Sequence, residues 1–352
     1  MIELSRRQAL AGATAVAAAG GLDLLTGTAI AQADANPVPE AGAASFNLLT
    51  YNIAMLPKFV PGGFGGEADR APLIPAKLRG YDAIIFNEAF HGSIRDNLLD
   101  ALRSEYPFQT QVVGLNSPWT EGDGGVVIVS RHPIDPPGRN VPERLFGNAC
   151  HGHVDPLTIL DLTDDYGADC NAAKGVLYAK IVKDGRNYHV FATHLDSGGH
   201  AGDRAARQQQ FRIVREFIDS MGIPVDEPVL IGGDLNVQMG DADEYATMLR
   251  VLNAAHPRLE SSLVTPVRTT LGGSFLDYIL FSNTHLRPRT SYNQVRRIRS
   301  DSPWKEGVSD LSDHHAVFGR FDFFDLVDIS ALTLVPALTI PVLLPTIAIP
   351  PP

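Results

Sequence analysis

The chain has 352 residues, of which 44% are apolar and 20% are charged. These are ordinary values for a globular protein, and they exclude intrinsic disorder as its main character. The formal charge of −11 argues against a protein that coats nucleic acid, because a polyanion would be repelled. Two cysteines are too few for a disulfide scaffold or a cysteine zinc cage, and 32 Gly with 25 Pro favour strands joined by long connections.

The first 35 residues have the pattern of an export signal. Arg6 and Arg7 precede an Ala/Gly/Val/Leu stretch, and small-x-small cleavage sites follow at Ala29-Ile30-Ala31 and Ala33-Asp34-Ala35. We therefore predict a twin-arginine signal peptide over residues 1–35 and a secreted protein. A membrane-anchoring helix is the alternative, but four residues interrupt the apolar run: Gly12, Gly20, Gly21 and Asp23.

Short apolar runs bounded by turn residues follow along the mature chain. Their length and their β-branched or aromatic content predict strands at 46–52, 83–87, 125–130, 175–182, 189–195, 229–235, 275–281 and 315–323. Apolar residues at helical spacing predict helices over 93–102, 203–221 and 241–252. No internal repeat and no polar linker divides this mixed α/β chain, so we expect one domain over residues 36–325.

Export also bears on the two cysteines. Cys150 and Cys170 are predicted to form a disulfide, because oxidation persists outside the cytosol. Closing a loop of that length stabilises a fold by roughly 3 kcal/mol in the chain-entropy model. The acidic segment between Cys150 and Lys174 is predicted to be a solvated loop.

The last segment, residues 326–352, is predicted to be an apolar, proline-rich tail. It carries no charge from Ile329 onward, and its prolines break any helix before it could span a bilayer. We expect an extended or poorly ordered segment, with a membrane contact as the alternative, since an exposed apolar run is a sticky surface.

Six predicted strands deliver a polar side chain at or near one end. A single polar group at such a place is usually a cap or a turn former. Six together predict side chains that meet at one rim of a sheet, where sites are commonly assembled. These residues are Asn52, Glu88, His194, the pair Asp234 and Asn236, Asp277, and the pair Asp313 and His314.

Carboxylates and amide oxygens beside histidine suit a hard divalent ion better than zinc. The chain offers no thiolate cluster or HxxxH-type spacing that would favour zinc. Mg²⁺, with Mn²⁺ or Co²⁺ as substitutes, takes one or two protein carboxylates and leaves positions for water and phosphate. This donor set predicts phosphoryl chemistry, with two separated histidines for proton transfer and charge stabilisation.

An ordered set of short segments stands out over roughly residues 45–323. The segments are Thr50-Tyr51-Asn52, Asn87-Glu88-Ala89-Phe90, Asp123-Gly124-Gly125, Val129-Ser130-Arg131-His132-Pro133-Ile134, Lys174-Gly175, Thr193-His194-Leu195, Gly233-Asp234-Leu235-Asn236, Leu276-Asp277-Tyr278 and Ser312-Asp313-His314. Each segment is weak by itself, but together they resemble the endonuclease/exonuclease/phosphatase superfamily. Within it, the segments at 87–90 and 123–125 and the cysteine pair before Lys174 resemble the secreted bacterial neutral sphingomyelinases.

The resemblance implies a DNase-I-like, four-layer α/β sandwich, in which two mixed β-sheets pack face to face with helices outside. It also implies an enzyme that hydrolyses sphingomyelin to ceramide and phosphocholine. A sphingomyelin-containing membrane surface would then be its peripheral partner, and we expect a monomer with no nucleic acid and no obligate protein partner.

Residue roles follow from the matching motifs. Glu88 would hold Mg²⁺, and Asn52 would contact metal or phosphate. His314 would be the general base, oriented by Asp277, and His194 would stabilise charge on the phosphoryl group. The supporting residues are Asp234 and Asn236 for water and phosphoryl oxygens, Asp313 at the metal or behind a histidine, and Lys174 for phosphate or as a solvated charge. On a strand His315 must point away from the face that carries His314.

Two departures from the family pattern bear on metal and membrane binding. The family often has a peripheral metal site, for which Phe90 and Asp123 are the candidates here. Gly92 and Gly122 replace two of its expected ligands, so we expect this site to be weakened or absent. The chain also offers only Trp304 where some members insert a hairpin with an aromatic pair.

Two other functions remain open at this point. A secreted nuclease or other phosphoesterase would share the metal and phosphate machinery. Five arginines could form its phosphate track or face anionic lipid: Arg287, Arg289, Arg296, Arg297 and Arg299. The second alternative is a catalytically idle protein that binds membranes through its apolar tail.

Overall fold

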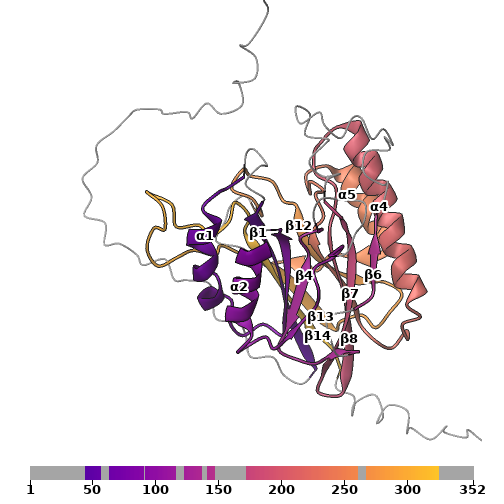
Figure 1. Ribbon diagram of the computed structural model, residues 1–352. Coiled ribbons are helices and arrows are strands. Elements are labelled where there is room, and N and C mark those ends of the chain that lie inside the picture. Colours follow the sequence, from indigo (N-terminus) through magenta and orange to yellow (C-terminus); the bar gives the residue numbers. More distant parts are fainter. Residues whose placement is uncertain are drawn as a thin grey trace, which may run out of the picture. The chain divides into compact units, whose positions relative to one another are not determined.

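The computed structural model of the protein describes residues 44–56, 63–90, 92–115, 123–136, 141–146, 172–260 and 267–324 (Figure 1). All of them belong to one compact unit, Ala35–Pro352. The predicted signal peptide, Cys150 and Cys170 with the loop between them, and the apolar tail lie outside the described residues.

Two mixed β-sheets contain the described strands (Figure 1). The first sheet has the order β11 (Arg258–Leu259), β13 (Thr290–Arg296), β14 (Ala316–Asp322), β1 (Ser45–Met55), β2 (Ala83–Ala89), β4 (Val127–Ser130) and β3 (Phe108–Gln109). The second has the order β10 (Ala254–Ala255), β12 (Asp277–Ser282), β9 (Val229–Asp234), β8 (Arg186–His194), β7 (Gly175–Lys183) and β5 (Ile134–Asp135), with β6 (Glu143–Leu145) also paired to β7. Three neighbouring pairs run parallel: β1 with β2, β8 with β9, and β11 with β13.

Side-chain alternation along β1 explains how the first sheet is buried on both faces. Phe46 and Leu48 join the core that also holds the second sheet, whereas Leu49 and Tyr51 join a separate core beneath helix α2. Successive side chains on a strand point to opposite faces, so Asn52 follows Leu48 onto the face between the sheets. The same alternation in β2 places Ala83 and Ile85 between the sheets.

Helices cover the outer face of each sheet (Figure 1). On the first sheet lie α1 (Glu67–Arg70), α2 (Gly92–Leu102) and the 3₁₀ turns η1 (Ala71–Leu73) and η2 (Pro75–Lys77). On the second lie α4 (Ala201–Ser220) and α5 (Ala242–Leu252), which bury Phe211, Val214 and Met248 against the strands. This arrangement confirms the predicted four-layer sandwich. Among the described helices none is long and apolar enough to cross a bilayer.

A buried ion pair links the two sheets. Lys183, at the end of β7, donates from Nζ to Asp82 Oδ2 at 3.1 Å and to the Ser45 carbonyl at 2.6 Å. The side chains of Asp82 and Lys183 are 5% and 4% exposed. Burial by itself would raise the pKa of Asp82, but the hydrogen bond to His132 and the charge of Lys183 outweigh it and hold that pKa below its ordinary value.

Asp82→Asn is expected to lower the free energy of unfolding by about 3 kcal/mol, because it leaves the buried Lys183 ammonium facing a neutral amide. Urea denaturation would measure the loss. The double variant Asp82→Asn/Lys183→Met should recover part of it, since neither charge then remains. A single variant as stable as the parent protein would contradict this account.

Half-buried His256 predicts acid sensitivity of the fold. Tyr245 Oη lies 2.8 Å from its Nδ1, and burial lowers the pKa of His256 to about 4. The unfolded chain binds this proton near pH 6.5, so stability is complete above that pH and falls as the pH drops toward 4. We expect a loss of about 2 kcal/mol between pH 6.5 and 4.5 from this residue. Denaturation at several pH values should show a smaller acid slope for His256→Phe, and equal slopes would refute the assignment.

Candidate active site

The strand register of the second sheet brings three of the predicted site residues side by side. His194 at the end of β8 pairs with Asp234 at the end of the parallel strand β9. Asp234 pairs in turn with Asp277, at the start of the antiparallel strand β12. The three side chains thus stand in one row across adjacent strands, and all are buried.

Glycine before Asp234 makes this register possible. At Gly233 the backbone has φ of 145°, and a Cβ there would lie 1.8 Å from the Thr193 carbonyl oxygen. Any side chain would therefore push β9 away from β8 at the point where His194 and Asp234 meet.

The first sheet supplies Asn52 and Glu88. Asn52 Nδ2 donates to Glu88 Oε1 at 2.9 Å and to Asp234 Oδ2 at 3.0 Å, while its Oδ1 accepts from Ala54 N–H. One buried amide therefore holds together two carboxylates from opposite sheets. Glu88 has φ of 55°, a strained left-handed conformation for a residue of this type.

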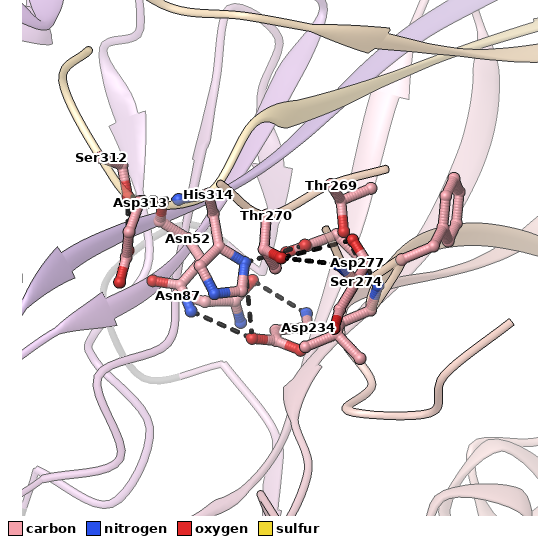
Figure 2. Close-up of polar contacts among 12 residues, drawn as sticks. Asn52, Asn87, Asp234, Thr269, Thr270, Ser274, Asp277, Ser312, Asp313 and His314 are labelled. Carbon is pink, nitrogen blue, oxygen red and sulfur yellow. Dashed lines mark hydrogen bonds and ion pairs between the residues drawn. The ribbon is translucent and has the colours of Figure 1, made fainter. Parts of the chain in front are cut away.

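His314 completes the cluster from the segment before β14. Its Nδ1 lies 2.9 Å from Asp277 Oδ2 and 3.8 Å from Asp234 Oδ2. Since a carboxylate only accepts, Nδ1 carries the hydrogen in the Asp277 contact and Nε2 is left for other partners. Figure 2 shows the Asn52, Asp234, Asp277 and His314 side chains converging from separate segments of the chain. His315, by contrast, is 1% exposed, and burial lowers its pKa to about 4.

Burial and neighbouring charges shift the pKa of three groups in the cluster: Glu88, Asp234 and His314. Burial raises the pKa of Glu88, and burial together with the charge of Asp277 raises the pKa of Asp234. Burial by itself would lower the pKa of His314, but Asp277, Asp234 and Glu88 outweigh it and hold that pKa well above its ordinary value. The cluster thus carries an excess of negative charge, which favours the binding of a cation.

The donor set fits a divalent cation. Potential ligand atoms of Glu88, His194 and Asp234 lie within 4.8 Å of one another, and so do those of Asp234, Asp277 and His314. Carboxylate oxygens outnumber imidazole nitrogens, which suits Mg²⁺ or Mn²⁺. A cation here would also relieve the repulsion between Glu88 and Asp234.

Asn236 and Lys174 meet at one backbone carbonyl beside the cluster. The Leu195 oxygen accepts from Asn236 Nδ2 at 3.0 Å and from Lys174 Nζ at 2.9 Å. Asn236 N–H donates to Asp234 Oδ1 at 3.0 Å, and its φ of 51° is a conformation that asparagine tolerates. Lys174 is 7% exposed, so it is no solvated charge.

Two other predicted residues, Asp313 and Asp123, have contacts of their own. Asp313 accepts from Ser312 Oγ at 3.3 Å, and its charge contributes to the raised pKa of Glu88. The carboxylate of Asp123, a candidate for the peripheral metal together with Phe90, accepts from Arg95 Nη1 at 2.6 Å and from Gly125 N–H at 3.0 Å. The protein itself therefore engages both oxygens of Asp123.

Two residues that support the site had no separate role in the sequence analysis. Asn87 accepts from Asp234 N–H at 3.2 Å and donates to the Thr193 carbonyl at 3.0 Å, so it bridges the sheets. Thr269 Oγ1 accepts from the N–H groups of Leu276 and Asp277. Asn87 could have been identified as a polar residue that directly follows the apolar run of β2. No feature of the sequence indicated a role for Thr269.

The five arginines considered as a phosphate track have other contacts. Arg297 and Arg299 both lie against Asp310, at 2.5 and 4.0 Å. Arg296 is 5% exposed and stacks on Phe318. The remaining two cover aromatic rings: Arg287 over Phe281 and Arg289 over Phe324. These contacts disfavour a continuous groove for nucleic acid.

Comparison with known proteins identifies the family of the chain. The sequence profile of the Endonuclease/Exonuclease/phosphatase family matches residues 49–314. A Sphingomyelinase C of Leptospira interrogans is 35% identical over 315 residues, which are 81% of this chain and 53% of that protein. The chain thus spans about half the length of this relative.

Two solved structures extend the similarity to the fold. The Sphingomyelinase C of Streptomyces griseocarneus superposes with a TM-score of 0.66 at 30% identity, over 79% of this chain and 99% of that one. A Staphylococcus aureus beta toxin variant with bound magnesium ions gives a TM-score of 0.63 at 29% identity, over 79% and 99%. The chain belongs to the Endonuclease/Exonuclease/phosphatase family of phosphoesterases, and over about four fifths of its length it is similar to bacterial sphingomyelinases C.

Proposed function

We propose that the protein is a secreted, divalent-metal-dependent phosphodiesterase that hydrolyses sphingomyelin to ceramide and phosphocholine. The observation that carries this proposal is the convergence of Glu88, His194, Asp234 and the Asp277–His314 pair in one cluster, in which Glu88 and His314 are half-buried and the others buried. The similarity to proteins named Sphingomyelinase C supports the choice of substrate.

His314 is the general base. Asp277 accepts the Nδ1–H hydrogen bond at 2.9 Å and fixes the orientation of the ring. Once the negative charges of Glu88 and Asp234 are offset, the His314 ring is neutral; its Nε2 then takes a proton from the attacking water, and Asp277 stabilises the imidazolium that forms. Thr269 holds the backbone of Asp277 and thereby the whole pair.

His194 and Asn236 act on the phosphoryl group. His194 stands beside Asp234 at the end of β8 and stabilises the negative charge that develops as the ester bond breaks. Asn236, held by Leu195 and Asp234, positions phosphoryl oxygens without adding charge. Lys174 orients Asn236 through their shared carbonyl and contributes positive charge nearby.

Glu88 is the principal ligand of the cation, with Asp234 and His194 in reach, while Asn52 holds the two carboxylates in place. Asp313 supports this side of the cluster. When bound, Mg²⁺, or Mn²⁺ or Co²⁺ in its place, supplies positive charge that offsets the charge on the phosphoryl oxygens. Phe90 and Asp123 remain the candidates for a weakened second site.

Export and membrane contact complete the proposal. Residues 1–35 direct the chain out of the cell by the twin-arginine route, the mature domain occupies residues 36–325, and Cys150 pairs with Cys170. The enzyme acts as a peripheral monomer on sphingomyelin-containing membranes.

Phosphocholine release from sphingomyelin vesicles, set against nicking of plasmid DNA by the same preparation, tests this function. We expect release that EDTA abolishes and Mg²⁺ restores, with no nicking. DNA nicking without phosphocholine release would refute the assignment in favour of a nuclease. Release that survives EDTA would refute the metal requirement.

A further inference from the structure

A cavity of about 240 Å³ opens beside Asn236, at the N-terminal ends of α4 and α5. Asn236 is bonded through its N–H to Asp234 of the catalytic cluster, and it also lines this cavity. A phosphoryl group held at Asn236 would have one ester substituent directed toward the cavity.

The wall of the cavity is rigid. Arg207 and Glu244, whose side chains are 2% and 5% exposed, form a bidentate pair at 2.8 and 3.2 Å. Arg207 Nη1 also donates to the carbonyls of Asp196 and Gly198, at 2.9 and 2.8 Å. These bonds tie α4 and α5 to the loop that follows His194, so the cavity exists before substrate binds.

Most of the side chains that line the cavity are polar or charged by residue type, which disfavours the ceramide half of the substrate. Among the described residues that line the cavity, none is aromatic, and Leu276 is the one large aliphatic side chain. A long apolar chain would lose its favourable burial in such surroundings. The cavity is thus suited to the small polar headgroup.

Hydrogen-bond acceptors remain available in the lining. Asp241 caps α5 by accepting from Glu244 N–H at 3.2 Å, and its other oxygen pairs with Arg204 at 2.6 Å. A carboxylate has about four acceptor positions, so this contact set leaves capacity. Asn236 uses its Nδ2 on Leu195, which leaves Oδ1 as an acceptor.

We infer that this cavity is the headgroup subsite and that it selects a primary ammonium over a quaternary one. A primary ammonium brings three N–H donors for the Asp241 carboxylate and Asn236 Oδ1. A trimethylammonium group donates no hydrogen bond and is recognised by aromatic faces, which this lining lacks among the described residues. The inference rests on the proposed function and extends it: ceramide phosphoethanolamine is a better substrate than sphingomyelin.

The test compares the two lipids in detergent micelles at equal surface mole fraction. We expect kcat/KM to be about tenfold higher for ceramide phosphoethanolamine, the effect of one added charge-assisted hydrogen bond. Asp241→Asn keeps the helix cap but removes the charge, and should bring the ratio of the two kcat/KM values close to one. Asp243→Asn changes an exposed acid in the same helical turn that does not line the cavity, and should leave both rates unchanged.

Product inhibition of the unaltered enzyme gives a second readout. Phosphoethanolamine should inhibit at about a tenfold lower concentration than phosphocholine. Equal or reversed preference in either measurement, or a ratio that Asp241→Asn does not change, would overturn the inference alone. Failure to hydrolyse either lipid would overturn the proposed function and this inference with it.

Discussion

Glu88→Gln is expected to reduce metal-dependent phosphocholine release at least about 100-fold while leaving the fold intact. Glutamine has the size of glutamate, and its amide oxygen can still accept from Asn52 Nδ2, so the link between the sheets persists. The variant lacks the negative charge with which the Glu88 carboxylate would bind a divalent cation.

Metal binding provides a readout of Glu88→Gln that does not depend on turnover. Added Mg²⁺ should raise the melting temperature of the parent protein, because a ligand that binds the folded state stabilises it, and should do so much less for the variant. Glu216→Gln, an exposed acid on α4, is the matched control and should behave like the parent. Normal turnover in Glu88→Gln would show that Glu88 is not a ligand of the metal.

His314→Ala should lower kcat by at least about 100-fold, the loss typical of removing a general base. The ring that accepts the proton is gone, and Asp277 is left with no imidazole to orient. His285→Ala, in the turn after β12, is the control and should keep full activity. A loss below about tenfold would assign the proton transfer to His194 or to water alone.

Asp277→Asn tests the contribution of Asp277, which orients the ring, separately from that of His314, which accepts the proton. The substituted side chain would retain the shape but could turn its amide N–H₂ toward His314 Nδ1, which favours the wrong tautomer of that histidine. We expect a smaller loss in kcat than for His314→Ala, and the Asp277→Asn/His314→Ala double variant should be no worse than His314→Ala. Additive losses in the double variant would show that the two residues act independently.

Much of the fold could be predicted from the sequence because the buried strands are apolar and well bounded. The runs at 83–87 and 229–235 became β2 and β9 with shifts of one or two residues at their ends. Strand β13 was missed because its sequence, TSYNQVR, shows no apolar alternation and its first residues are half-buried or exposed. The two-residue strands β3, β5, β10 and β11 are too short to carry any periodic signal.

The chemistry of the site could be predicted, but its internal contacts could not. Glu88 and His314 were identified by residue type and position at strand ends. The link from Asn52 to Asp234 spans 182 positions and depends on how two sheets pack, which no local pattern encodes. The alignment of His194 with Asp234 likewise depends on a register that Gly233 permits.

Crystals of the active enzyme grown with Mn²⁺ would test the central claim most directly, since anomalous scattering locates the ion without reference to any assumed ligand. We predict a peak within coordination distance of the Glu88 carboxylate, about 2.0–2.6 Å, and in the same cluster as Asp234 and His314. A fully occupied Mn²⁺ elsewhere in the molecule, with none at Glu88, would contradict the account.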